Sequence, residues 1–207
     1  MTARSVPRPR RTQAERLETS GQALLGAAAQ LIAEKGWAAT SAAEIGRRAG
    51  YSRAMVDARF GGKDALLDVL ISTEFEQRLE PTVGADENGL DTVLAFFDHM
   101  QALHDEDPEF LQSMFIMNFD ATKRGAVHRP RLASWLERLY VAWEGHLRRG
   151  VGDGSVRADI DVTEAATDMG TAVLGVCYGW VMLPWRYDFP TQLAHVRDQV
   201  IERYRAR

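Results

Sequence analysis

Three side chains in the segment 53–60 could read the edges of DNA bases, if that segment is a helix whose outer face they share. Arg53 carries the planar pair of donors that guanine accepts, and Met55 and Ala58 offer apolar contact to a thymine methyl group. The same side chains also fit an ordinary solvated helix face. The elements that would present this face therefore decide between the two interpretations.

Segment 53–60 is predicted to be the second of two short helices. Ser41 and Glu44 form a capping-box pattern, which starts a helix that ends at Gly50. Ser52 is placed to cap the next helix, whose inner face is apolar. Two short helices joined by a glycine-containing turn predict a helix-turn-helix, and the second helix of such a pair fits the DNA major groove.

A series of motifs extends through residues 24–67 without an insertion. They read AA at 27–28, LIAEKGW at 31–37, ATS at 39–41, AEIGRRAGYS at 43–52 and FGGKDALL at 60–67. In these motifs and their spacing the segment resembles the N-terminal domain of TetR-type bacterial transcriptional regulators. The resemblance covers about a quarter to a third of the chain. It implies a three-helix DNA-binding domain, followed by a larger helical domain for ligand binding and dimerisation.

The resemblance also implies which side chains contact double-stranded DNA. It favours base contacts for the outer face of helix 53–60 and phosphate contacts for Thr40, Arg59 and Lys63. The complete predicted set is Thr40, Ser52, Arg53, Ala54, Met55, Asp57, Ala58, Arg59 and Lys63. A dimer with two such helices would read a pseudo-palindromic site.

Three positions depart from the family pattern, which commonly has Gly at 54, Tyr at 57 and His or Tyr at 59. Here these residues are Ala54, Asp57 and Arg59. Asp57 places an anion on the face that should meet a polyanion. It could pair with Arg53 four residues earlier, or it could accept a hydrogen bond from a cytosine amino group. Both arrangements stay open, and Asp57 is also the one feature that supports a loss of DNA binding.

The charge distribution favours a single end that faces a polyanion. The chain has a net charge of −4, but residues 1–64 hold 11 Lys+Arg against 6 Asp+Glu, and the remaining residues hold 14 against 23. The basic part includes an arm, residues 1–14, whose four arginines either touch DNA or belong to a solvated tail. The single cysteine, Cys177, excludes a disulfide framework. No apolar stretch follows the first charges, so a cytoplasmic protein is expected.

Helical periodicity continues to the end of the chain, and no segment alternates with the period of a strand. Apolar stripes predict helices over residues 25–36, 63–80, 90–100, 107–115, 132–147, 161–185 and 190–204, with a glycine-rich loop over residues 150–161. The fold class is therefore all-α, with about nine helices. We divide the chain into the arm, a helix-turn-helix domain over residues 15–62 and a helical effector-binding and dimerisation domain over residues 63–207.

Aromatic and methionine side chains are frequent on the apolar stripes of the larger domain. Such residues usually form core, but the resemblance implies that some of them line a pocket for a small-molecule effector. The candidate lining residues are Phe97, Met100, Met114, Trp135, Trp143 and Met169. Their chemistry predicts an apolar or amphipathic effector.

The segment 169–185 contains no charged residue. It is shorter than the about 20 residues that a membrane span needs, and it contains glycines and a proline. A helix that is buried on all sides is therefore the better interpretation. In the family, the last two helices form a four-helix interface between two copies. We expect a homodimer joined through these helices, and no membrane contact.

Other chemistries find little support in the sequence. His99 and His104 are five residues apart, which places them badly on one helix face for a metal site. No nucleophile, base and acid combine in a recognisable way, so neither an enzyme nor a cofactor is expected. The sequence thus predicts a ligand-responsive DNA-binding regulator that acts as a repressor. The alternative is a helical small-molecule-binding or enzymatic protein that has lost DNA binding.

Overall fold

The computed structural model describes residues 13–81, 84 and 86–207, and the part that it describes is built from helices. They are α1 (Gln13–Ala39), α2 (Ala42–Arg48), α3 (Arg53–Phe60), α4 (Lys63–Val69), η1 (Leu70–Glu76), α5 (Gln77–Leu79), α6 (Gly89–Glu106), α7 (Pro108–Asp120), α8 (Arg129–Asp153), α9 (Val162–Met182) and α10 (Phe189–Tyr204). Because α4, η1 and α5 follow one another as one rod, the described part contains nine helical rods. Its β pairing is limited to an isolated bridge between Val156 and Arg205. The expected all-α fold is confirmed.

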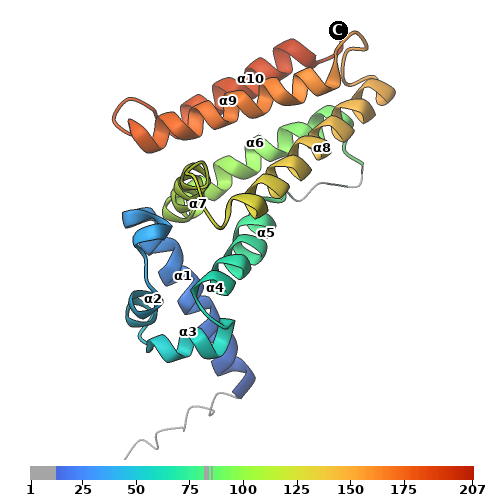
Figure 1. The fold of residues 1–207 in the computed structure, drawn as a ribbon. Coiled ribbons are helices and arrows are strands. Elements are labelled where there is room, and N and C mark those ends of the chain that lie inside the picture. The colour runs from blue at the N-terminus through green and yellow to red at the C-terminus, as the bar shows by residue number, and fades with distance from the viewer. Residues whose placement is uncertain (1–12, 82–83, 85) are drawn as a thin grey trace, which may run out of the picture.

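The helices form two bodies, and the rod α4–η1–α5 runs from one to the other (Figure 1). Helices α1, α2 and α3 lie at one end of the molecule, whereas α9 and α10 lie side by side at the opposite end. Helix α1 packs along α7, which joins the smaller body to the larger one. The predicted basic arm, residues 1–14, falls almost entirely outside the described residues.

The first turn of α2 is fixed by the capping box that the sequence predicts. The Glu44 N–H donates to Ser41 Oγ at 3.3 Å, and the Ser41 N–H donates to Glu44 Oε2 at 3.1 Å. The Glu44 carboxylate accepts hydrogen bonds from Lys35 Nζ and from the hydroxyl and N–H of Ser41, and these lower its pKa to about 2. Ser52 occupies the N-cap position of α3, but its side chain makes no capping hydrogen bond, so that part of the prediction is wrong.

The middle of the connecting rod, η1, is a π-helix. A π turn inserts extra backbone, so carbonyl groups at its start lose their usual donors. Here the Ser72 hydroxyl donates to the Asp68 carbonyl at 2.9 Å, and the Thr73 hydroxyl donates to the Val69 carbonyl at 2.8 Å. The rod is as continuous as the sequence predicts, and two hydroxyl groups support its wider turn.

Helix α8 extends farther than the sequence predicts. The glycines indicate a loop from Gly150, but α8 continues to Asp153 and ends at Gly154, which has a φ of 80°. Gly89 lets α6 approach α8, because a Cβ there would lie 2.1 Å from the Gly150 nitrogen, whereas a Cβ on Gly150 would lie 2.5 Å from Val156 Cγ2. In a sequence, a glycine that permits close packing looks the same as one that ends a helix.

Candidate DNA-binding face and effector cavity

Helix α3 presents an exposed face at the end of the molecule opposite to α9 and α10 (Figure 1). The exposed residues at its start and along this face are Ser52, Arg53, Ala54, Asp57 and Ala58. Their spacing places the four helical positions on one side of α3, while Val56 on the other side is fully buried. A face of this kind fits the width of a DNA major groove.

Met55 does not share this face. Its side chain is half-buried and packs against the core, as does that of Tyr51. The two residues are four positions apart, so their side chains cover the same apolar side of the helix-turn-helix. The prediction that Met55 lies on the outer face is therefore wrong.

The three candidate phosphate contacts are all engaged within the protein. Thr40 is 2% exposed, and its hydroxyl donates to a backbone carbonyl four residues earlier at 2.9 Å. The Arg59 guanidinium lies against α1, with Nη2 3.2 Å from the place that a Cβ on Gly21 would occupy. Lys63 Nζ donates to the Trp37 carbonyl at 2.8 Å and lies 4.2 Å from the centroid of the Trp37 ring. The phosphate contacts stay predictions, and each requires a side chain to leave or share its present partner.

Arg53 and Asp57 form an ion pair on the outer face of α3. Arg53 Nε lies 3.6 Å from Asp57 Oδ2, and the two side chains are 72% and 50% exposed. Exposed pairs with this spacing stabilise a helix by only about 0.2–0.5 kcal/mol, so the pair opens readily. The structure thus contains the first of the two arrangements expected for Asp57. The second, a contact to cytosine, stays a prediction.

Gly46 sets the distance between α2 and α3, and none of the sequence motifs singles it out for this role. A Cβ at Gly46 would lie 2.7 Å from the carbonyl carbon and oxygen of Ser52 and 3.0 Å from the Arg53 nitrogen. The Gly46 carbonyl also accepts a hydrogen bond from the Tyr51 N–H at 2.7 Å, which closes the turn. The available signal in the sequence was the glycine itself, because glycine inside a short helix costs stability.

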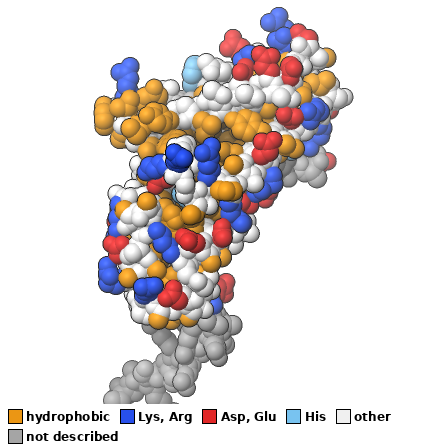
Figure 2. Space-filling view, viewed as in Figure 1, with side chains coloured by type: hydrophobic (Ala, Val, Ile, Leu, Met, Phe, Trp, Pro, Cys, Tyr) orange, Lys and Arg blue, Asp and Glu red, His pale blue; other side chains and the backbone are white. Residues whose placement is uncertain are grey.

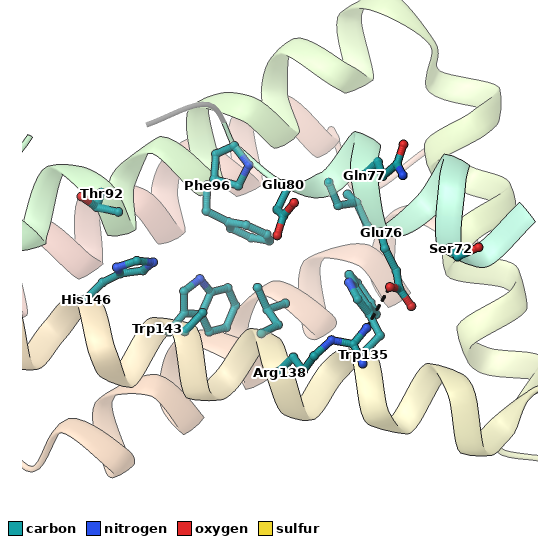
Figure 3. A pocket seen from close by; sticks show the side chains of 14 residues that line it. Ser72, Glu76, Gln77, Glu80, Thr92, Phe96, Trp135, Arg138, Trp143 and His146 are labelled. Atoms are coloured by element: carbon teal, nitrogen blue, oxygen red, sulfur yellow. Dashed lines mark ion pairs between the residues drawn. The ribbon is translucent and has the colours of Figure 1, made fainter. Parts of the chain in front are cut away.

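A cavity of about 550 Å³ lies between the α4–η1–α5 rod, α6 and α8 in the larger body (Figure 3). Trp135 and Trp143 of α8 and Phe96 of α6 form its aromatic walls. A narrow apolar compartment of about 30 Å³ adjoins the cavity, shares these three rings and reaches Met100 and Met114. The cavity falls in the range of about 300–1,000 Å³ that is typical of small-molecule sites.

Four of the six predicted lining residues border this space. Trp135 and Trp143 line both parts, and Met100 and Met114 line the narrow compartment. Phe97 and Met169 line neither part, and they are only 1% and 2% exposed. A role of these two residues in ligand binding stays a prediction, because periodicity identifies the buried side of a helix but not which buried residues border a gap.

Comparison with known proteins places this arrangement in a family. Residues 24–70 match the model of the bacterial regulatory proteins of the tetR family. The solved structure of TylP, a TetR regulator from Streptomyces fradiae, matches with a TM-score of 0.71 at 21% identity, over 94% of this chain and 89% of that one. Residues 24–70 thus form a domain of the TetR family, and the whole chain has the fold of TetR regulators. No curated relative matches it.

Two other solved structures resemble this chain over most of its length. SmeT, the repressor of the Stenotrophomonas maltophilia multidrug efflux pump SmeDEF, has a TM-score of 0.73 at 25% identity, over 89% of this chain and 90% of that one. FadR from Bacillus subtilis, solved in complex with stearoyl-CoA, has a TM-score of 0.72 at 18% identity, over 87% and 97%. The family match of residues 24–70 thus identifies the protein as a DNA-binding transcriptional regulator.

Regulators of the TetR family are generally not enzymes. Among the described residues, no three His, Cys, Asp or Glu side chains gather where they could hold a metal ion. His99 Nε2 lies 2.5 Å from the Arg78 carbonyl oxygen, and the His104 ring stacks on Phe189. In the described part of the chain, no helix has both the length and the apolar character that crossing a membrane requires.

In the single chain, helix α9 is buried on one side and exposed on the other, so burial on all sides requires the second copy that is expected from the sequence. One side buries Val173 and Cys177. The exposed stripe along the other side consists of Thr171, Gly175, Tyr178 and Met182. At the turn before α10, Met182, Leu183 and Trp185 are 52%, 38% and 81% exposed, and apolar side chains gather there at the surface (Figure 2). A single chain therefore leaves part of this apolar segment open to solvent.

Two elements of the chain contact both the cavity and the smaller body that contains α1, α2 and α3. Helix α7 lines the narrow compartment, and at its end Asp120 Oδ2 accepts a hydrogen bond from the Trp37 N–H at 3.3 Å. Gly36 has a φ of 76°, and a Cβ there would lie 2.7 Å from the same Asp120 oxygen. The rod supplies Glu76 to the cavity and starts at Lys63, which holds Trp37. A movement of the cavity walls can thus be passed to α1 through α7 and Asp120, or through the rod and Lys63.

Proposed function

We propose that this protein represses transcription by binding a pseudo-palindromic DNA operator as a homodimer. It reads the operator with the outer face of α3, and it leaves the DNA when a small apolar or amphipathic effector fills the cavity. The observation that carries this proposal is the exposed face of Arg53, Ala54, Asp57 and Ala58, which projects from a body that holds a cavity. In this scheme residues 15–62 are the DNA-binding domain, residues 63–207 bind the effector and the second copy, and the protein acts in the cytoplasm.

The exposed side of α9 supports the homodimer. A contiguous apolar surface of this kind is unusual on a protein that stays monomeric. Two copies related by a twofold axis would cover it with the same surface of the partner, through α9 and α10. The two α3 helices should then lie about 34–36 Å apart, which is one turn of DNA.

The shared elements α7 and α4–η1–α5 support the effector response. A ligand shifts the protein between two states only if it binds one of them more tightly. A molecule in the cavity would touch the rod at Glu76, and one that reaches the narrow compartment would also touch α7. Either contact can favour a spacing of the two α3 helices that does not match the operator.

Selection of binding sites from a pool of random DNA duplexes tests the proposed function. The full-length protein should enrich an inverted repeat whose half-sites are about 10 base pairs apart, centre to centre. The affinity for the enriched site should fall steeply with salt, because contacts to phosphates release counterions. A pool that gains no shared motif after repeated rounds would contradict the proposal.

Replacement of Asp57 with asparagine is expected to relax the preference at one base pair of each half-site. The carboxylate can accept from a cytosine amino group, and such a contact discriminates by about 1–3 kcal/mol. The measurement is the affinity for the selected site and for its single-base variants, with Asp68→Asn, an exposed aspartate on α4, as the control. Equal tightening on all sequences would show that Asp57 only repels phosphate. Unchanged affinity and preference would show that α3 does not present this face to DNA.

A further inference from the structure

We propose that the effector is a lipophilic organic cation, whose positive charge lies against Glu80 and whose apolar part lies among the aromatic walls of the cavity. This inference rests on the effector role that we propose for the cavity. It names the class of ligand from the charges and rings that surround the 550 Å³ space.

The walls of the cavity suit a cation with an aromatic or branched apolar body. The rings of Phe96 and Trp143 meet edge to face, with centroids 5.0 Å apart, and Trp135 lines the same space from the next turns of α8. Tryptophan faces attract cations more strongly than those of other aromatic residues, and the attraction grows when water is excluded. Beyond the rings, the narrow compartment offers apolar contacts for the uncharged part of a ligand.

The ionisable groups of the cavity leave one negative charge without a partner. Arg138 Nη2 lies 2.8 Å from Glu76 Oε2, so these two lining side chains neutralise each other. Arg131 Nε approaches the same carboxylate at 3.9 Å. Glu80 is exposed, and no lysine, arginine or histidine in the described part of the chain forms an ion pair with it.

The positive groups at the other end of the cavity do not offset Glu80. Burial and the nearby Arg149 guanidinium lower the pKa of His146, which is therefore neutral at pH 7. Arg149 itself does not line the cavity, because its guanidinium donates to Thr92 Oγ1 and lies near the carbonyls of Glu87 and Asn88. At neutral pH the lining groups thus sum to one negative charge.

The position of Glu80 places this charge where a ligand would meet it. Figure 3 shows its carboxylate beside the Phe96 ring, between the rod and α8. A cation in the cavity would gain both the carboxylate and the ring faces. An anion would meet Glu80 and would have to break the Arg138–Glu76 pair to find a positive partner.

Two probes with the same shape and opposite charge test this inference. Tetraphenylphosphonium and tetraphenylborate would be titrated into the full-length protein by calorimetry, in the absence of DNA. The wild-type protein should bind the phosphonium more tightly than the borate by about tenfold or more. Equal affinities, a preference for the borate, or no binding of either probe would overturn the proposal.

The Glu80→Gln variant then locates the source of the preference. Glu80 is exposed, so this isosteric change should leave the fold intact, and the phosphonium preference should fall about tenfold. The matched control is Glu137→Gln, an exposed glutamate on α8 that does not line the cavity, and it should keep the wild-type preference. If the Glu80→Gln variant still prefers the phosphonium, the positive charge of the ligand does not lie against Glu80. Release of the selected operator by phosphonium is measured separately, so a failure of the proposed function remains distinguishable from a failure of this site.

Discussion

The Gly175→Arg variant is expected to be a monomer and to bind the operator about a hundredfold or more weakly than the wild-type protein. Gly175 lies on the exposed side of α9, and nothing lies within 4 Å of the position that a Cβ would occupy there. An arginine therefore fits the single chain but places a charge in the centre of the proposed interface. Because two linked half-site contacts bind with far greater avidity than one, loss of the dimer removes most of the operator affinity.

Sedimentation at micromolar concentration and operator binding by fluorescence anisotropy measure this effect. The control is Gly145→Arg, because Gly145 is also an exposed helical glycine with open space around its Cβ position, but it lies on α8. It should remain a dimer with normal operator affinity. A Gly175→Arg protein that sediments as a dimer would show that the two copies do not meet through α9.

The Gly46→Ala variant is expected to lose operator binding by about tenfold or more, although it adds only a methyl group. That methyl would lie 2.7 Å from the Ser52 carbonyl group, a distance that requires α2 and α3 to move apart. Overpacking of this kind costs about 1–3 kcal/mol of folding free energy, and the altered angle of α3 misplaces its outer face. Thermal unfolding and anisotropy on the selected operator separate the two effects.

Gly26→Ala is the matched control within the same body. Gly26 lies in α1, is exposed and has no atom within 4 Å of its Cβ position. Alanine there should stabilise the helix by about 0.5–1 kcal/mol and leave operator binding unchanged. If Gly46→Ala binds the operator as tightly as Gly26→Ala does, the close contact between α2 and α3 has no role in positioning α3.

Local patterns in the sequence predict the helix-turn-helix well, because its elements are set by neighbours along the chain. The capping box of Ser41 and Glu44 and the buried position of Val56 follow from spacing alone. Met55 was misplaced because its side depends on how α3 packs against the rest of its body. The roles of Gly46 and Gly150 depend on close contacts, with the backbone of Ser52 and with the side chain of Val156 respectively, which spacing does not record.

The cavity was predictable in its apolar part and not in its charged part. Trp135 and Trp143 belong to an apolar stripe, so periodicity places them on the inner side of α8. Glu76, Glu80 and Arg138 border the same space only because the rod and α8 come together in three dimensions. The sequence therefore predicts an apolar effector site in general terms. Which charged side chains line that site can be assigned only from the structure.

The central claim is that the outer face of α3 contacts DNA, and the most direct test is to place a negative charge there. Ala58 is exposed on this face, and Ala133 is exposed on α8 in the other body. Fluorescence anisotropy on the selected operator would compare Ala58→Glu and Ala133→Glu with the wild-type protein. The account predicts that Ala58→Glu weakens binding by about tenfold or more, whereas Ala133→Glu binds normally. Wild-type affinity in Ala58→Glu would contradict the claim, because an added carboxylate with no base amino group as its partner is repelled by the phosphates.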